Sequence, residues 1–173
     1  MKPAIMIMGV SGCGKSSVGA ALAAALGGAF LDGDDYHPQS NVDHMVAGQP
    51  LTDAMRWPWL DRLAAVVTER RGQDVTVFAC SALKRSYRDH LRAGIADLQI
   101  VYLDAPQALI AARLGRRQGH FMPPALLASQ YAALEPPLRA ILVSVDQPIA
   151  GIVAAVTPRL SLTEPAPPAS PLP

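Results

Sequence analysis

Short apolar runs alternate with helical segments along almost the whole chain, and this alternation restricts the possible folds more than any other feature. Five apolar runs are expected to be strands: residues 4–8, 29–31, 75–79, 98–103 and 141–145. The segments with helical patterns are residues 15–26, 39–48, 53–71, 84–92, 106–117, 125–134 and 149–160. Strands that are apolar throughout are buried on both faces, and strands joined through helices run parallel. The sequence therefore predicts an α/β fold with one parallel sheet covered by helices on both faces.

The chain is long enough for one domain with a full hydrophobic core. Its 173 residues match the size of a single domain and hardly that of two. We expect this domain to span residues 1–162. The last eleven residues, 163–173, contain five prolines, and this composition predicts a disordered tail.

Charge, apolar runs and cysteines exclude several classes of partner. Fifteen basic and fourteen acidic residues give a net charge of +1, which provides no field to hold a long nucleic acid. The longest nearly apolar stretch, residues 19–31, is shorter than the roughly 20 residues that a membrane span needs. The two cysteines, Cys13 and Cys80, form neither a disulfide framework nor a metal cluster. We therefore expect a cytoplasmic protein that binds a small molecule, with no nucleic-acid or membrane partner.

The strongest local motif is a phosphate-binding loop between the first strand and the first helix. Residues 9–16 match the pattern G-x-x-x-x-G-K-[ST] in full. In such a loop the glycines let backbone N–H groups turn toward phosphate oxygens, and the start of the helix adds the positive end of its dipole. Lys15 is expected to follow the β- and γ-phosphates, and the Ser16 hydroxyl to bind Mg²⁺. The predicted nucleotide-binding residues here are Gly9, Val10, Ser11, Gly12, Cys13, Gly14, Lys15, Ser16 and Ser17.

Carboxylates at strand ends indicate which kind of nucleotide-binding protein this is. The strings N-K-x-D and D-x-x-G of switch GTPases do not occur. Asp104 follows the run 98–103 and has two interpretations, a helix cap, which we favour, or a metal-binding acid.

A pair of carboxylates, Asp32 and Asp34, follows the second strand and is separated by one glycine. Such a pair can divide two tasks. Asp32 would help to hold Mg²⁺, and Asp34 would accept a proton or a hydrogen bond from an attacking hydroxyl. The alternative is a polar turn rich in Asp and Gly, which is common.

Six strings of the sequence resemble the gluconokinases of the shikimate-kinase-like P-loop group: residues 8–16, 31–38, 80–89, 119–123, 129–130 and 134–136. The resemblance extends over about residues 4–160, and C-S-A-L-K-x-x-Y-R-D is its most specific string. It implies the transfer of phosphate from ATP to D-gluconate, with Mg²⁺, in a homodimer. It also implies a three-layer P-loop kinase fold, with a five-stranded parallel sheet in the order 2-3-1-4-5 and a helical lid at about residues 115–124.

The expected acceptor site combines cations with hydrogen-bonding side chains, because a sugar acid is an anion that carries hydroxyls. Lys84 and Arg88 share one helix face after a strand expected beside the phosphate-loop strand, whereas Arg85 points elsewhere. The alternative for each is an exposed charge, and for His37 a turn residue before Pro38. The predicted substrate-binding residues are Asp34, His37, Arg56, Lys84, Arg88 and His120.

The lid contributes two arginines, Arg113 and Arg117, spaced i, i+4 and followed by Gly119 and two prolines. A glycine hinge after a helix is typical of a segment that closes over a nucleotide. Arg117 is expected to neutralise charge on the transferred phosphoryl group, and Arg113 to stack on adenine or hold a phosphate. The alternative is charge compensation at a helix end. The predicted catalytic residues are Lys15, Asp34 and Arg117, and the predicted metal ligands are Ser16 and Asp32.

One position departs from the resemblance, and it leaves other functions open. The usual sequence of the family at residues 50–60 is P-L-x-D-x-D-R-x-P-W-L, but Met55 occupies the position of its second aspartate. If that acid caps a helix its loss affects stability, and if it orients Arg56 the loss affects substrate affinity. The alternatives are another small-molecule or nucleoside monophosphate kinase, and a nucleotide-binding module without catalysis. A further hypothesis is that a helix start lowers the thiol pKa of Cys13 and Cys80 and that their oxidation blocks the cleft.

Overall fold

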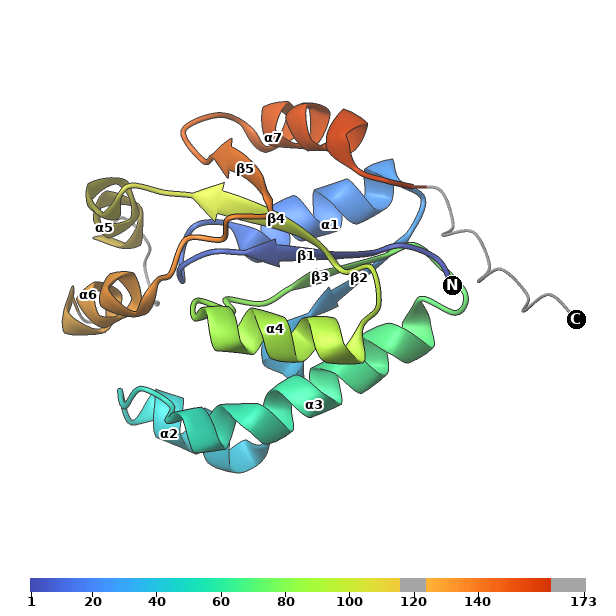
Figure 1. The fold of residues 1–173 in the computed structure, drawn as a ribbon. Helices are drawn as coiled ribbons and strands as arrows, with labels where there is room; N and C mark the ends of the chain where they lie inside the picture. Colours follow the sequence, from blue (N-terminus) through green and yellow to red (C-terminus); the bar gives the residue numbers. More distant parts are fainter. Residues whose placement is uncertain (116–123, 163–173) are drawn as a thin grey trace, which may run out of the picture.

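The computed structural model describes residues 1–115 and 124–162, and its centre is a five-stranded parallel sheet (Figure 1). The strand order is β2-β3-β1-β4-β5, with every neighbouring pair parallel. This order and the α/β class confirm the prediction. The strands are β1 (Ala4–Met8), β2 (Ala29–Asp32), β3 (Thr76–Ala79), β4 (Gln99–Asp104) and β5 (Ile141–Ser144).

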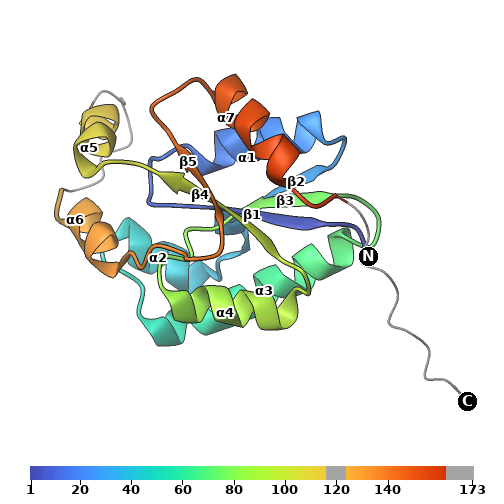
Figure 2. The ribbon, with the colours of Figure 1, turned by 45° about the horizontal axis from the view of Figure 1, so that its top comes forward.

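Helices cover both faces of the sheet and give the molecule three layers. Figure 2 shows α1 and α7 on one side of the strands and α3 and α4 on the other. α5 and α6 lie at the end to which the arrowheads of β1 and β4 point (Figure 1). The bounds are α1 (Lys15–Ala25), α2 (Gln39–Val46), α3 (Asp53–Arg70), α4 (Arg85–Gly94), α5 (Gln107–Gly115), α6 (Pro124–Ala133) and α7 (Ile149–Val156), with 3₁₀ turns η1 (Gly33–Tyr36) and η2 (Thr157–Arg159).

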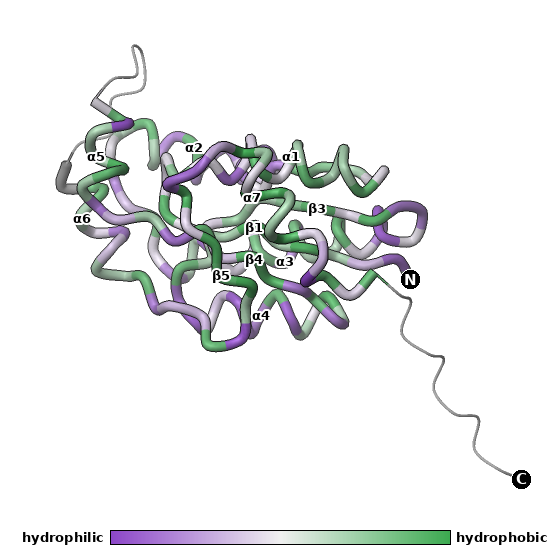
Figure 3. Tube along the Cα trace, turned by 90° about the horizontal axis from the view of Figure 1, so that it is seen from above, coloured by the Kyte–Doolittle hydropathy of each residue, from purple (hydrophilic) through white to green (hydrophobic). Residues whose placement is uncertain are grey.

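Strand β1 is apolar at every position because its two faces belong to two different cores. Ile5 and Ile7 pack with Leu22 of α1 in one cluster. Met6 and Met8 pack with Leu63 of α3 in the other. All five residues of β1 are fully buried, and the hydropathy colouring of Figure 3 is green along this strand. The two cores hold the carboxyl end of β1, and with it the phosphate loop, in a rigid frame.

Within residues 1–115 and 124–162, none of the helices combines the length and the apolar character that a bilayer span requires. The expected tail, residues 163–173, and most of the expected lid lie outside the described residues.

Candidate active site

The phosphate loop joins β1 to α1, and its glycines adopt backbone conformations that other residues avoid. Gly14 precedes α1 with φ of +99°. Gly9 has φ of +150°, and a Cβ there would lie 2.8 Å from Cys13 Sγ and 3.0 Å from the carbonyl oxygen of Leu103. Both values lie where side chains are disfavoured. The loop geometry therefore requires glycine at these positions, as the motif predicts.

The cationic and hydroxyl groups of the loop follow directly after it in α1. Lys15 Nζ donates to the carbonyl oxygen of Val10 at 3.1 Å, so its side chain folds back over the loop. Ser16 Oγ donates to Asp32 Oδ2 at 2.6 Å. The structure thus brings together the two predicted metal ligands, which come from α1 and from the end of β2. A hydroxyl and a carboxylate offer the oxygen ligands that Mg²⁺ prefers, with phosphates and water completing its shell.

The two carboxylates of the Asp-Gly-Asp string have different surroundings. Asp32 is the N-cap of η1, where its Oδ1 accepts the backbone N–H of Asp34 at 3.1 Å. The side chain of Asp34 is 80% exposed, and its Oδ1 lies 3.8 Å from His37 Nε2. Asp32 is therefore held from two sides, whereas Asp34 projects into solvent with one histidine beside it. The turn-forming role and the proposed chemical roles coexist in one segment.

The side chain of His37 is buried, unlike that of an exposed residue in a turn. Its imidazole is 3% exposed and stacks on Trp59, with 4.0 Å between ring centroids and 18° between ring planes. Trp59 Nε1 donates to the carbonyl oxygen of Gly33 at 2.8 Å. Burial lowers the pKa of His37 more than the nearby Asp34 raises it. The neutral ring and Trp59 together support the turn that carries Asp34.

Asn41 is a site residue that the sequence reasoning missed. It belongs to α2, is 2% exposed, and donates from Nδ2 to the carbonyl oxygen of Met55 at 3.0 Å. The same nitrogen lies 3.3 Å from His37 Nδ1. A lone asparagine in a helical pattern has no motif that marks it, and its contact with His37, which precedes α2 in an extended conformation, is set by the fold.

A second cluster of polar side chains links the start of α3 to the start of α4. Lys84 Nζ lies 2.9 Å from Asp53 Oδ1 and 3.0 Å from Oδ2. The hydroxyl of Tyr87 donates to Asp53 Oδ1 at 2.5 Å, and Arg56 donates to the hydroxyl of Tyr87 at 3.4 Å and to the carbonyl of Leu51. The hydrogen bond from Tyr87, and then the one from Lys84, lower the pKa of Asp53. Two cations, Lys84 and Arg56, are thereby held around one tyrosine.

Arg88 lies apart from this cluster, although the sequence places it on the same helix face as Lys84. It is 3% exposed, and it donates to the carbonyl oxygens of Ala82 at 3.0 Å and Leu83 at 2.8 Å. Ala82 has φ of +38°, a conformation that a buried donor helps to hold. Arg88 therefore shapes the loop that precedes Lys84. Arg85 faces solvent, as expected, and pairs with Asp89.

α5 and α6 each contribute one polar side-chain contact, and the contact from α6 reaches the phosphate loop. Arg113 donates to the carbonyl oxygen of Val145 at 2.7 Å, just after β5. Gln130 Oε1 accepts the backbone N–H of Ser11 at 2.7 Å. Gln130 is a second missed residue, although it lies in one of the strings that carry the resemblance. Arg117 and His120 lie outside the described residues.

Two expectations from the sequence are wrong. The first helical hydrogen bond of α5 runs from Ile110 N–H to the carbonyl of Pro106, so the N-cap is Pro106 and not Asp104. Cys13 and Cys80 do follow neighbouring strands, but both are buried. Burial raises the pKa of Cys13, and it raises the pKa of Cys80 to about 12. Desolvation of each buried thiol raises its pKa more than Lys15 and the nearby backbone N–H groups lower it.

The structure also locates Met55, for which the sequence left two interpretations. Thr52 is the N-cap of α3, and its Oγ1 accepts the backbone N–H of Met55 at 3.3 Å. Met55 is therefore the N3 position, where an acid completes a reciprocal capping pair. This geometry supports the capping interpretation of the family acid.

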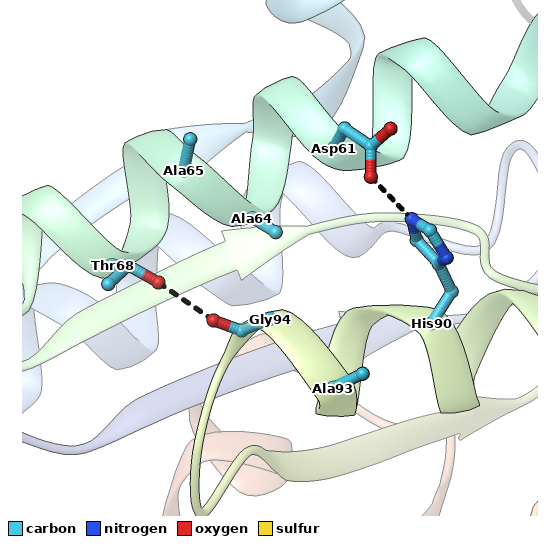
Figure 4. Close-up of a pocket in the computed structure, with 7 residues that line it drawn as sticks. All are labelled: Asp61, Ala64, Ala65, Thr68, His90, Ala93 and Gly94. Atoms are coloured by element: carbon cyan, nitrogen blue, oxygen red, sulfur yellow. Dashed lines mark hydrogen bonds and ion pairs between the residues drawn. The ribbon is translucent and has the colours of Figure 1, made fainter.

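A groove of about 440 Å³ between α3 and α4 lies apart from the residues of the candidate active site (Figure 4). Two side-chain contacts bridge it: His90 Nε2 lies 2.6 Å from Asp61 Oδ1, and Thr68 Oγ1 donates to the carbonyl of Gly94 at 3.2 Å. Its lining includes none of the predicted site residues: Asp61, Ala64, Ala65, Thr68, His90, Ala93 and Gly94.

Comparison with known proteins gives a consistent result. Residues 5–137 match the model of a family described as an AAA domain. A gluconokinase of Gluconobacter oxydans is 49% identical over 77% of this chain and 75% of its own length. The thermoresistant gluconokinase of Escherichia coli is 42% identical over 87% and 89%. The crystal structure of a gluconokinase from Sinorhizobium meliloti is 46% identical, with a TM-score of 0.79 over 89% of both chains. The chain therefore belongs to the gluconokinase family of P-loop kinases.

Proposed function

We propose that this chain phosphorylates D-gluconate with ATP and forms 6-phospho-D-gluconate and ADP. The observation that carries the proposal is the contact of 2.6 Å between Ser16 and Asp32, with Asp34 two residues further on. This contact unites a phosphate loop with a carboxylate pair suited to a hydroxyl acceptor, which a nucleoside monophosphate kinase or a non-catalytic module does not need. The names and identities of the relatives support gluconate as the acceptor.

The proposed reaction is an in-line transfer of the γ-phosphoryl group to a primary hydroxyl. Asp34 orients that hydroxyl and accepts its proton, and Lys15 stabilises negative charge on the phosphoryl oxygens. Ser16 and Asp32 would hold Mg²⁺, which when bound neutralises charge between the phosphates. Val10, Ser11, Gly12, Cys13, Gly14 and Ser17 complete the loop around the nucleotide. Arg117 and Arg113 are proposed as lid residues for the phosphoryl group and the nucleotide.

On the acceptor side we assign the anionic end of the substrate to Lys84 and Arg56. Both cations lie beside Tyr87, at 5.5 Å and 5.4 Å from the ring centroid. We keep His37, Arg88 and His120 as substrate-side residues, with Arg88 acting through the loop that it holds. We also propose a homodimer in the cytoplasm.

A coupled assay of ADP release tests this function against gluconate, shikimate, nucleosides and nucleoside monophosphates. We expect turnover with gluconate and little with the others. Asp34→Asn should lower kcat by about 10²- to 10⁴-fold, the usual contribution of a general base, with the KM for ATP unchanged. Near-normal turnover of that variant, or preference for another acceptor, contradicts the proposal.

A further inference from the structure

The orientation of the buried Asn41 amide determines which nitrogen of His37 carries a hydrogen. The amide atom near Met55 lies 3.0 Å from a backbone carbonyl oxygen. A carbonyl oxygen only accepts hydrogen bonds, so this amide atom is the NH₂ group. The same nitrogen lies 3.3 Å from His37 Nδ1 and offers only hydrogens. His37 Nδ1 must therefore accept, and a neutral ring with an accepting Nδ1 carries its hydrogen on Nε2.

The other ring nitrogen, Nε2, faces the carboxylate of Asp34, two residues after the proposed metal ligand Asp32. His37 Nε2 lies 3.8 Å from Asp34 Oδ1. An N–H directed at a carboxylate attracts it, whereas the lone pair of an unprotonated nitrogen repels it. The tautomer of His37 thus decides whether the exposed side chain of Asp34 is held near the ring.

The imidazole cannot easily escape this arrangement. One face stacks on Trp59 at 4.0 Å, and Trp59 is itself bound to the carbonyl of Gly33 in the turn that carries Asp34. Burial favours the neutral ring by lowering the pKa of His37; Arg56 acts in the same direction and Asp34 in the opposite one. Both conditions of the tautomer argument, a neutral ring and a fixed orientation, are therefore met.

We propose that Asn41 is a positioning residue that holds His37 in the Nε2–H tautomer, and that this tautomer orients the carboxylate of Asp34. The inference rests on the proposed function, in which Asp34 receives the acceptor hydroxyl. Asn41 also ties α2 to the start of α3 through Met55, so one buried amide connects the base to the helix that carries Asp53 and Arg56. His37 neither takes nor gives a proton in this role.

The tautomer is measured directly in the full-length enzyme with ¹⁵N-labelled histidine. Long-range ¹H–¹⁵N correlation distinguishes a protonated from an unprotonated ring nitrogen, and the resonances of His37 are assigned by their loss in His37→Gln. We expect a neutral His37 with its hydrogen on Nε2 at pH 7. A hydrogen on Nδ1, or a doubly protonated ring, overturns the proposal without any variant being needed.

Asn41→Asp tests the role of the amide at nearly constant shape. A carboxylate only accepts hydrogen bonds, so His37 should move its hydrogen to Nδ1 or become doubly protonated. If the hydrogen moves to Nδ1, Nε2 has no donor for Asp34, and we expect kcat with gluconate to fall about 10- to 100-fold, the loss typical when a group that orients a site ligand is removed, with the KM for ATP unchanged. A doubly protonated ring keeps its Nε2–H, so kcat should then stay near normal. An unchanged tautomer, or a changed tautomer with kcat within about twofold of normal, overturns the proposal.

Two variants of His37 separate the two ring nitrogens. Glutamine places its amide nitrogen near the Nε2 position, and asparagine places it near Nδ1. We expect His37→Gln to retain more kcat than His37→Asn by about tenfold or more, since only glutamine keeps a donor toward Asp34. Equal loss in the two variants contradicts the proposed direction of the hydrogen bond.

A matched control is the second histidine–carboxylate contact, His90 with Asp61, in the groove between α3 and α4. Asp61→Asn should change the resonances of His90 and leave kcat unchanged. The tautomer is read in the resting enzyme, whereas gluconate turnover by the wild type tests the proposed function. Failure of one is therefore distinguishable from failure of the other.

Discussion

Lys84 and Asp53, which are 31 positions apart, form an ion pair in which both carboxylate oxygens lie within 3.0 Å of the ammonium nitrogen. Lys84 precedes α4 and Asp53 begins α3. The pair therefore joins the starts of two helices on the same side of the sheet and holds a cation at the proposed acceptor site.

Asp53→Asn should weaken gluconate binding more than it affects ATP. The carboxylate accepts from Lys84 and Tyr87, so its loss frees Lys84 and also Tyr87, which accepts a hydrogen bond from Arg56. We expect the KM for gluconate to rise about tenfold or more, as for other supporting residues, with the KM for ATP unchanged. The melting temperature should hardly move, since exposed ion pairs contribute little stability.

Asp89→Asn is the control for this variant, because it makes the same charge change and breaks an exposed ion pair within α4, between Asp89 and Arg85. Both KM values should stay normal in the control. An equal rise of the two KM values in Asp53→Asn indicates general damage to the site and contradicts the acceptor-side role.

Asp32→Asn should raise the Mg²⁺ concentration needed for half-maximal rate. Asp32 accepts the hydroxyl of Ser16 at 2.6 Å, and removing its charge weakens the attraction for a cation bound between them. We expect a shift of about 10- to 100-fold in a Mg²⁺ titration at saturating ATP. Asp35→Asn, the same charge change on a neighbouring exposed residue, should leave the titration unchanged. An equal shift in the two variants attributes the effect to overall charge.

Met55→Glu and Met55→Gln should both stabilise the protein. Met55 is the N3 position of α3 after the N-cap Thr52, so either side chain can complete a capping box. We expect a gain of about 0.3–1.5 kcal/mol in the free energy of unfolding, measured by denaturant titration. Met55→Leu, which adds no acceptor, is the control. If glutamate alone lowers the KM for gluconate, the family acid acts on Arg56 instead.

Cys13 and Cys80 should resist alkylation in the native enzyme. The thiolate is the reactive form, and with the pKa of Cys80 at about 12 only about one thiol in 10⁴ is ionised at pH 8. We expect iodoacetamide to label the unfolded protein fully while the native protein stays unlabelled, as read by mass spectrometry.

The pH dependence of this labelling tests the direction of the pKa shift. Both folded-state thiol pKa values lie above the unfolded ones, so the thiols stay protonated in the folded state while those of the unfolded chain ionise. The alkylation rate of the native protein should therefore keep rising beyond about pH 10, where a thiol of ordinary pKa is already ionised. The contribution of these thiols to stability is present below about pH 9 and declines above it. A rate that is half-maximal near pH 8.5–9 and constant above about pH 10 contradicts the raised values.

The sequence by itself determined the sheet and the phosphate loop. The central strand β1 is apolar at every position because it supplies alternate side chains to two cores. The edge strands β2 and β5 are mostly apolar too, although they are only partly buried. The loop is equally local, since the backbone angles of Gly9 and Gly14 depend on residues within one short segment. Sequence neighbours decide such features, so a contiguous motif is sufficient to predict them.

Only the tertiary structure decided which partner each polar side chain takes. Lys84 and Arg88 share a helix face in sequence, yet Lys84 reaches Asp53 and Arg88 turns back to the loop carbonyls. Asn41 gains its role because the packing of α2 against the start of α3 places it between His37 and Met55. A hydrogen bond depends on distance and direction within fractions of an ångström, and only the packed helices and strands set those.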